Sequence, residues 1–335
     1  MKIWHSLVLA GLILTPFGAR ASPDNTAEVK AQFQRPGPAP HPRFNPFTTA
    51  KAKLGKVLFF DPRLSGANAI SCADCHNPRL GWEDGLARSF GAAGRPLDRH
   101  TPTILNLAWA KQFGWDGRIP TLEGFVLGPI ANAKEMDQDL DNLVTELRAV
   151  PGYASLFAAA FPGTEINIDH VSLAIATFER TVVSDTAPFD RWIAGDETAI
   201  GTSAKKGFGL FIGKAGCAQC HKGWAFTDNA FHDIGLPSLD MGRGGLEDAP
   251  QDSKHAFKTP TLRNIVSRAP YMHDGSLDTL ETVIDHYADK FKRRRTLAKE
   301  IKPLSLSGED KLNLVAFLHI LTEDKKRVLL PEIPQ

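Results

Sequence analysis

Two short motifs contain the residue types that attach and ligate haem. Cys72 to His76 and Cys217 to His221 both read Cys-x-x-Cys-His, and they hold all four cysteines of the 335-residue chain. In such a motif the two thiols form thioethers with the haem vinyl groups, and the histidine coordinates the iron from one face. We therefore expect two covalently attached haem c groups, with His76 and His221 as proximal iron ligands. The expected attachment residues are Cys72, Cys75, Cys217 and Cys220.

Two other kinds of site also use paired cysteines. A zinc site can be built from two Cys-x-x-Cys pairs, and a thioredoxin-like dithiol needs only one. Neither requires a histidine directly after both pairs, so haem attachment is the favoured interpretation. No cysteine is left over for a structural disulfide.

The segment after the first motif recurs after the second one. Residues 101–123 match residues 259–281 at nine of 23 positions, with one offset of 158 residues and no gap. The same offset pairs Pro129 with Tyr287. A tyrosine oxygen can ligate iron and a proline side chain cannot, so we expect an open first haem and a second haem closed by Tyr287. The alternatives are a surface hydroxyl at Tyr287, with Met241 or Met272 as the second ligand.

The amino terminus has the pattern of a secretory signal. An apolar run at residues 7–14 is followed by Ala-Arg-Ala ending at Ala21, so we expect residues 1–21 to be a cleaved signal peptide. The alternative is a retained membrane anchor, but such an anchor needs about 20 apolar residues and Pro16 and Gly18 break this run, so we expect no membrane span after signal cleavage. The expected location is the periplasm. Cleavage leaves 37 basic and 38 acidic residues, a balance that gives no reason to expect nucleic acid as a partner.

The elements that position the two motifs are predicted to be mostly α-helical. Apolar residues recur at helical spacing in 51–60 and 205–211, before the two motifs, and in 138–150, 168–183 and 309–321. Asp169 and Ser307 are the expected helix caps. We expect two cytochrome-c-like haem domains related by the internal repeat. The expected boundaries are 22–47 for a proline-rich arm or linker, 48–187 for an N-terminal peroxide-binding domain and 188–335 for a C-terminal electron-transfer domain.

Several blocks resemble the bacterial dihaem cytochrome c peroxidase and MauG superfamily, and the resemblance covers nearly the whole mature chain. The blocks are the two Cys-x-x-Cys-His motifs and residues 101–103, 115–118, 128–136, 178–181, 226–228, 259–264 and 270–275. The resemblance implies that Trp115 relays electrons between the haems and that Glu135 acts over the peroxide-binding haem. Tyr287 stands where MauG-like members carry tyrosine and the peroxidases of the family carry methionine.

The chain departs from the family pattern around the first haem. The region 90–94 lacks the switchable histidine of the peroxidases, so the first haem should be open without reductive activation, and His100 is the only nearby candidate to fill it. Phe125 replaces a distal glutamine, which leaves Glu135 as the main polar group. His100 and Arg268 replace residues that bind calcium between the haems. The positive charge of the Arg268 side chain disfavours a calcium ion beside it, so we expect no bound calcium. A calcium site remains the alternative.

The resemblance implies a periplasmic enzyme that uses hydrogen peroxide at the open haem to oxidise a partner protein through a high-valent state shared by both haems. Related MauG-like members oxidise tryptophan side chains, and Glu135 would move the proton of the peroxide. The alternative is a cytochrome c peroxidase that takes electrons from a small cytochrome or cupredoxin. A non-enzymatic electron carrier would need two protein ligands on each haem iron. Pro129 argues against this, because a proline side chain cannot ligate iron. We expect the basic residues between Lys290 and Arg295 to form a solvated face, with docking of an acidic partner as the alternative.

Overall fold

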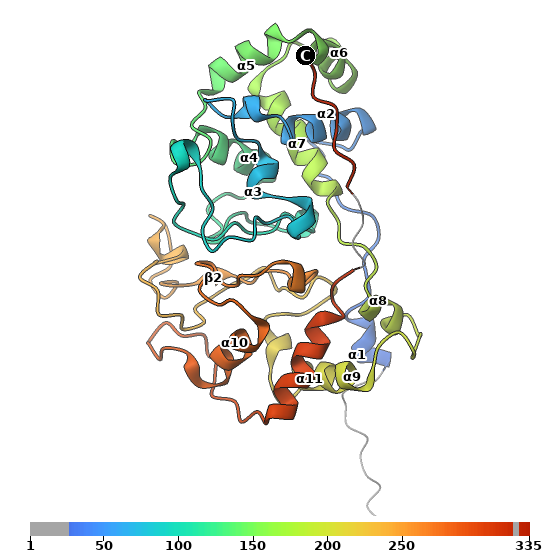
Figure 1. Cartoon of the computed structure of the whole chain (residues 1–335), viewed down its shortest axis with the longest axis vertical. Helices are drawn as coiled ribbons and strands as arrows, with labels where there is room; N and C mark the ends of the chain where they lie inside the picture. Colours follow the sequence, from blue (N-terminus) through green and yellow to red (C-terminus); the bar gives the residue numbers. More distant parts are fainter. Residues whose placement is uncertain (1–26, 324–327) are drawn as a thin grey trace, which may run out of the picture.

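The computed structural model describes residues 27–323 and 328–335, so the predicted signal peptide lies outside the described residues. The chain forms two halves stacked along its long axis, and the prediction of a mostly helical fold is confirmed (Figure 1). The first half contains α2 (Thr49–Phe59), α3 (Cys72–Cys75), α4 (Leu122–Ala131), α5 (Leu140–Ala149), α6 (Pro151–Ala160) and α7 (Ile168–Thr181). The second half contains α8 (Pro188–Ile193), α9 (Thr202–Ile212), β1 (Phe231–His232), β2 (Phe257–Lys258), α10 (Leu280–Asp285) and α11 (Gly308–His319). A short α1 (Ala27–Ala31) lies beside the second half.

Each half is built on one close helix pair. In the first half α2 packs along α7, and a Cβ on Gly55 would lie 1.9 Å from the carbonyl oxygen of Ala174. In the second half α9 packs along α11, and a Cβ on Gly207 would lie 1.9 Å from the carbonyl oxygen of Asn313. Only glycine allows backbones to approach this closely. The same packing device therefore holds the helix before each Cys-x-x-Cys-His motif.

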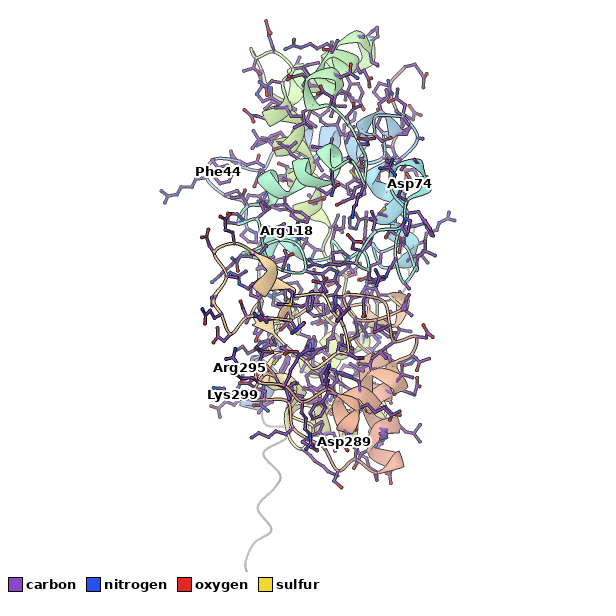
Figure 2. The ribbon with its side chains drawn as sticks, turned by 90° about the vertical axis from the view of Figure 1, so that its left-hand side faces the viewer. Phe44, Asp74, Arg118, Asp289, Arg295 and Lys299 are labelled. Carbon is purple, nitrogen blue, oxygen red and sulfur yellow. The ribbon has the colours of Figure 1, made fainter. Side chains whose placement is uncertain are left out.

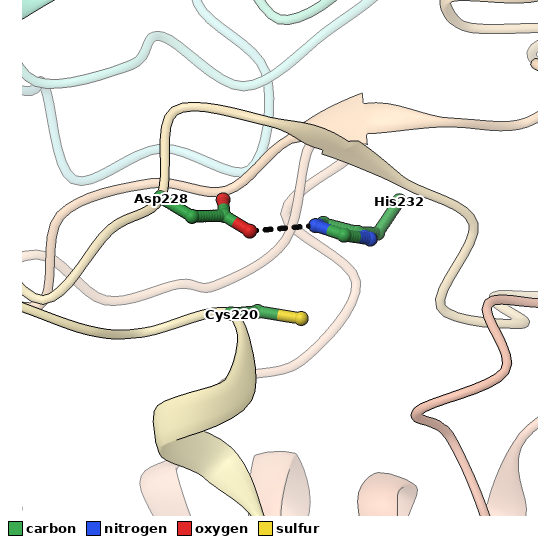
Figure 3. A group of neighbouring side chains, drawn as sticks. All are labelled: Cys220, Asp228 and His232. Carbon is green, nitrogen blue, oxygen red and sulfur yellow. Dashed lines mark hydrogen bonds and ion pairs between the residues drawn. The ribbon is translucent and has the colours of Figure 1, made fainter.

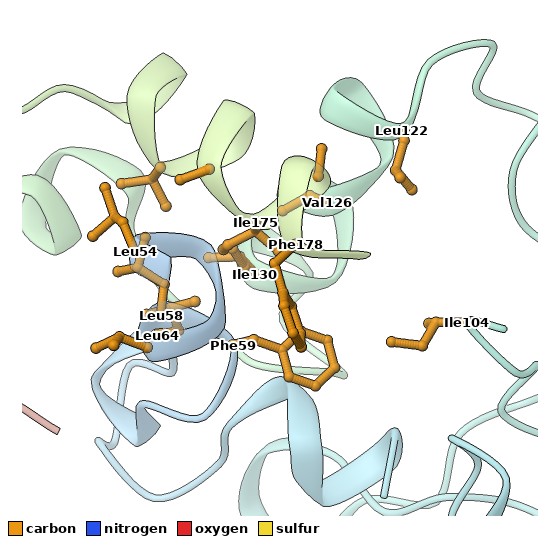
Figure 4. Close-up of a cluster of buried hydrophobic side chains, with 14 of the residues drawn as sticks. Leu54, Leu58, Phe59, Leu64, Ile104, Leu122, Val126, Ile130, Ile175 and Phe178 are labelled. Atoms are coloured by element: carbon orange, nitrogen blue, oxygen red, sulfur yellow. The ribbon is translucent and has the colours of Figure 1, made fainter. Parts of the chain in front are cut away.

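The apolar faces of these helices form two hydrophobic clusters. Leu54, Leu58 and Phe59 of α2 face Ile175 and Phe178 of α7 in the first cluster (Figure 4). The second cluster is rich in aromatic rings that pack edge to face, an arrangement favoured by their quadrupoles. Its buried rings are Phe33, Phe189, Trp192, Phe208, Phe211, Phe226, Tyr271 and Phe317.

One predicted cap is confirmed and the other is wrong. Ser307 Oγ accepts from the Asp310 backbone N–H at 3.1 Å and begins α11, as predicted. The cap of α7 is Asn167, whose Oδ1 accepts from the His170 backbone N–H at 2.9 Å. Asp169 lies inside the first turn, where its negative charge still complements the helix dipole.

The two ends of the chain pack on opposite halves. Phe33 is 3% exposed and belongs to the second cluster, whereas Val328 and Ile333 pack against the first cluster. Arg63 Nη2 donates to the carbonyl oxygen of Pro334 at 2.6 Å, and Figure 1 marks the C-terminus beside α6. The arm therefore contributes to the core of the second half and the last residues contribute to the first, while the expected domain boundaries stay a prediction.

The segments related by the 158-residue offset share local backbone structure. Asn106 and Asn264 both have positive φ, at 64° and 58°, and isolated antiparallel bridges join Phe113 to Ile119 and Tyr271 to Leu277. This agreement supports the proposal that the two halves arose by duplication. Among the described residues, the helices are too short or too polar to cross a bilayer.

Candidate functional site

The first Cys-x-x-Cys-His motif lines a cavity of about 1210 Å³ at the meeting of the two halves. Cys72, Cys75 and His76 contribute to its wall, and so do Pro129 and Glu135 from the segment that includes α4. The structure thus brings together all the residues predicted for the open haem. Phe125 also lines this cavity and packs against Phe113, with ring centroids 6.2 Å apart.

The second motif lines a smaller cavity of about 200 Å³. Cys217, Cys220, His221 and Tyr287 all lie on its wall. Burial, and then the neighbouring Cys217 and Cys220, raise the pKa of the Tyr287 hydroxyl above its usual range. A phenolate at Tyr287 therefore requires a positive charge in the cavity, such as a ferric iron.

Both motif histidines are oriented by the same backbone contact. His76 Nδ1 lies 3.2 Å from the carbonyl oxygen of Trp82, and His221 Nδ1 lies 2.9 Å from that of Phe226. Trp82 and Phe226 both have positive φ, at 64° and 53°. A hydrogen bond from Nδ1–H to a carbonyl leaves the Nε2 lone pair available for a metal. Burial lowers the pKa of both histidines, which favours the neutral form that can ligate.

The donor set fits haem better than zinc. Burial raises the pKa of the Cys75 thiol to about 11 and that of Cys217 to about 12, which keeps these two thiols protonated when no metal is bound. Each cavity offers two thiols followed by one imidazole, which are the groups that a c-type haem uses. The residues present therefore fit two haem groups, one in each half.

Glu135 is half-buried and is held by a neighbouring amide. Asn132 Nδ2 donates to Glu135 Oε1 at 2.8 Å, and Oε2 has no hydrogen-bond partner among the described residues. Burial raises the pKa of Glu135, while Asn132 and Arg118 oppose the rise. The 90–94 loop packs behind this carboxylate, because Ala92 N donates to the carbonyl oxygen of Glu135 at 2.7 Å. A Cβ on Gly91 would lie 2.0 Å from the carbonyl oxygen of Lys134, so the loop needs glycine there.

Trp115 lies in the wall between the two cavities and lines both of them. Its Nε1 donates to the carbonyl oxygen of His100 at 2.7 Å, and its own carbonyl oxygen accepts from Lys258 N at 2.8 Å. His273, which the repeat pairs with Trp115, stands edge-on to the indole with ring centroids 6.5 Å apart. His273 also stacks on Phe257 at 3.6 Å. The position predicted for Trp115, between the haem sites, agrees with this placement.

The structure argues against His100 as a ligand of the first haem. Its Nδ1 lies 2.7 Å from the carbonyl oxygen of Leu86, and its Nε2 lies 3.1 Å from Glu83 Oε2. Arg268 Nη1 donates to Glu83 Oε1 at 3.1 Å, so one buried carboxylate joins two positively polarised groups from the two halves. His100 and Arg268, which stand at the positions that the family resemblance associates with calcium, are thus both engaged by Glu83.

One group of side chains near the second motif resembles a metal site. Cys220, Asp228 and His232 place one potential ligand atom each within 4.8 Å of one another (Figure 3). Asp228 Oδ2 lies 2.9 Å from His232 Nε2, and hydrogen bonding to Asp228 and then Cys220 raises the pKa of His232 to about 10. A protonated imidazole cannot ligate a metal, and Cys220 is expected to carry haem. We therefore assign the group to the surroundings of the second haem.

The basic residues that follow Tyr287 differ in whether their side chains are paired inside the fold or exposed at the surface. Arg294 pairs with the buried carboxylate of Asp233, with Nε donating to Oδ2 at 2.6 Å. Arg295 and Lys299 are labelled on the surface of the same half (Figure 2). Arg294 is therefore a structural residue, and a docking surface would have to consist of its neighbours.

Sequence reasoning missed Lys258 and Glu179. Lys258 lines both cavities, and Glu179 lines the first, where burial raises its pKa to about 8. A signal for Lys258 existed, because the 158-residue offset pairs it with His100. Glu179 lies within a block of the family resemblance, but nothing in its spacing indicates that it faces a cavity.

Comparisons with known proteins agree with this geometry. Residues 49–198 match the family model described as di-haem cytochrome c peroxidase. The chain is 51% identical to methylamine utilization protein MauG of Methylorubrum extorquens, over 94% of this chain and 90% of that protein. It is 35% identical to the cytochrome c551 peroxidase of Nitrosomonas europaea, over 84% and 83%. A crystal structure of a MauG-like protein associated with microbial copper homeostasis superposes with a TM-score of 0.80 at 32% identity, covering 86% of this chain and 93% of that chain.

Proposed function

This chain belongs to the di-haem cytochrome c peroxidase family and is a haem-dependent oxidoreductase, and from this premise we propose that it uses hydrogen peroxide to oxidise tryptophan side chains of a partner protein. The observation that carries the proposal is the contrast between the two cavities. Pro129 and Glu135 line the first, where they leave a position for peroxide, whereas Tyr287 lines the second and can close it. We assign His76 and His221 as proximal ligands, and the four motif cysteines as haem attachment residues.

A haem held by Cys72, Cys75 and His76 would supply a redox-active iron that reacts with peroxide. The chain's own contribution is to handle protons and to exclude other ligands. Glu135 Oε1 is held by Asn132, so Oε2 is the atom that takes the peroxide proton and returns it to the leaving oxygen. Pro129 has no side-chain donor or acceptor, so it would not ligate the iron of a haem bound in this cavity. Trp115, fixed by hydrogen bonds at its Nε1 and its carbonyl oxygen, provides the electron route between the cavities.

The choice of a protein substrate is supported by Tyr287. An anionic oxygen ligand lowers the potential of a haem and hinders electron input from a small donor protein, and the peroxidases of the family carry methionine there. The similarity to MauG is also greater than that to the copper-associated protein, at 51% against 32% identity. We therefore propose that the partner takes part in methylamine utilization. The amino-terminal sequence pattern supports a periplasmic location for this reaction.

We further propose that no calcium is bound between the two halves. Glu83, His100 and Arg268 already neutralise one another there, with both ion pairs at 3.1 Å. A divalent cation in the same place would have to lie beside a guanidinium group.

Stopped-flow mixing of the resting protein with one equivalent of hydrogen peroxide tests the proposed function. We expect the protein to remain two electrons more oxidised than at rest for minutes, and to return to the resting spectrum when a tryptophan-containing partner is added. Rapid turnover with a reduced cytochrome or cupredoxin, without such persistence, would instead identify a cytochrome c peroxidase. Two low-spin haems in the resting spectrum would contradict the open first site.

A further inference from the structure

Lys258 reaches from the second half into the first. It ends β2, and its backbone N–H donates to the carbonyl oxygen of Trp115 at 2.8 Å. Its Nζ donates to the carbonyl oxygen of Gln112 at 3.0 Å and lies 5.9 Å from the ring centroid of Phe113. Gln112 and Phe113 belong to the first half, and Phe113 lines only the first cavity. The ammonium group therefore lies on the side of the first cavity.

This ammonium has no carboxylate partner among the residues that the structure describes. Four other cations that line the first cavity are each paired with a carboxylate at 3.1 Å or less: Arg99, Arg118, Lys134 and Arg268. Arg88 also lines it but is exposed to solvent. Lys258 differs from these five residues because it is partly buried and has no carboxylate partner among the described residues.

The counterpart of Lys258 in the internal repeat does have a carboxylate partner. The 158-residue offset pairs Lys258 with His100, and the backbone contacts correspond: His100 N donates to the carbonyl oxygen of His273 at 2.8 Å, as Lys258 N does to that of Trp115. The side chain of His100 meets Glu83 at 3.1 Å, whereas none of the described carboxylates meets Lys258. Burial alone lowers the pKa of Lys258, to about 8. Lysine is rarely buried without a counter-ion, because desolvating an unpaired ammonium is costly.

We propose that Lys258 binds a carboxylate of the group held in the first cavity, namely a propionate of the haem attached at Cys72 and Cys75. The two remaining N–H groups of its ammonium are available as donors to this carboxylate. The second half thereby supplies the positive charge that neutralises this propionate of the haem in the first half. The inference requires a haem in the first cavity, and it does not depend on which substrate the enzyme oxidises.

The test uses the holoprotein with Lys258→Met, Lys258→Arg and the control Lys254→Met, since Lys254 is an exposed lysine that lines neither of the two cavities. Spectroelectrochemical titration measures the reduction equilibrium of each haem, and resonance Raman spectroscopy measures the propionate bending bands. We expect Lys258→Met to shift the first haem towards the oxidised form by about tenfold, or about 59 mV for a one-electron couple. The second haem should change less, and the propionate band of the first should move. Lys258→Arg should retain the potential and alter the band, while Lys254→Met should change neither, because solvent screens its charge.

Two results would overturn the proposal. If Lys258→Met leaves both potentials and the propionate bands unchanged, Lys258 serves only as a donor to Gln112. If the second haem shifts more than the first, the carboxylate belongs to the other cavity. Haem content and thermal melting are recorded for each variant. Should Lys258→Met fail to hold both haems, the Raman band of Lys258→Arg decides, since this variant keeps the charge, and an unchanged band would refute a direct contact.

Discussion

Helices α4 and α10 occupy corresponding places in the two halves, yet they end differently. Both begin at a threonine cap, with Thr121 Oγ1 accepting from Gly124 N and Thr279 Oγ1 accepting from Thr282 N, each at 3.2 Å. Helix α4 continues as a regular helix through Pro129 to Ala131. Helix α10 stops at Asp285 and gives way to a π-helical turn, His286–Lys290, which carries Tyr287. A π turn adds a residue to the helical repeat and is often found at functional sites. In the proposed assignment, this one altered turn separates the closed second site from the open first site.

The segment that follows α4 adds a second difference between the two halves. After α4 it folds back, because Met136 N donates to the carbonyl oxygen of Pro129 at 3.2 Å and Glu135 N donates to that of Asn132 at 2.9 Å. The return brings the carboxylate of Glu135 to the first cavity, where Pro129 stands at the position that the repeat pairs with Tyr287. The two halves therefore share the backbone contact that orients each motif histidine and differ in the segment that follows α4 or α10.

Replacing Tyr287 by phenylalanine is the most severe way to break this contrast. We expect the second haem to change from low spin to high spin in the electron paramagnetic resonance spectrum. The oxidised state that persists after peroxide addition should be lost entirely, together with partner oxidation. Tyr271→Phe is the matched control, because Tyr271 is also a buried tyrosine that lines the second cavity. Spin states that stay the same in Tyr287→Phe would show that another residue is the ligand.

Glu135→Gln should abolish proton transfer in the first half without touching the second. We expect the rate of reaction with peroxide to fall by about 10²–10⁴-fold, while both resting spin states stay unchanged. Stopped-flow absorbance measures the rate, and the exposed Glu165 supplies the control Glu165→Gln. A fall in this rate of less than tenfold would show that another group accepts the proton, and Glu179 is the next candidate.

The pH dependence of the same reaction sharpens the assignment. Burial raises the pKa of Glu135 above its usual 4.5, so the rate should rise with pH through a midpoint above that value, as the carboxylate forms. The amide of Asn132 lowers this pKa, so Asn132→Ala should move the midpoint to still higher pH. Glu135→Gln should lose this limb of the profile. A midpoint that moves down in Asn132→Ala would contradict the contact.

The Glu83–Arg268 contact tests how the halves are joined. Removing one partner of a buried ion pair costs about 3–5 kcal/mol, so Arg268→Met should lower the free energy of unfolding by that amount. A chelator should leave the melting temperature and both haem spectra of the wild type unchanged. Lys206→Met breaks an exposed pair with Glu309 and is the control expected to show no change. Destabilisation of the wild type by the chelator would restore the calcium alternative.

The smallest effect is expected from the exposed basic residues near Tyr287. Replacing Lys292 and Arg295 by glutamine should change partner oxidation by less than about twofold at physiological salt, because exposed charges are screened. Arg294→Gln should instead reduce stability, since it removes the partner of the buried Asp233. Steady-state oxidation of the partner at two salt concentrations distinguishes these cases. A large loss in the double variant would indicate docking.

Much of the site could be predicted because short motifs determine its chemistry. The cysteine and histidine positions follow from spacing alone, and the offset of the repeat is enough to pair Pro129 with Tyr287. The π turn at His286–Lys290 could not be predicted, because its sequence has the same helical periodicity as the regular turn in α4. The contact between Lys258 and Gln112 joins positions 146 residues apart, and no local pattern specifies it.

The crossing of the chain ends has a mechanical consequence. Phe33 anchors the beginning of the described chain in the second half, and Ile333 anchors its end in the first. A hinge motion that opened the space between the halves would have to extract both anchors, and each extraction exposes apolar surface to water. Two-domain proteins often flex about their linker, but here the two ends of the described chain each pack on the opposite half. The spacing between the two cavities is thereby held nearly constant, which would also fix the distance that an electron crosses between groups bound in them.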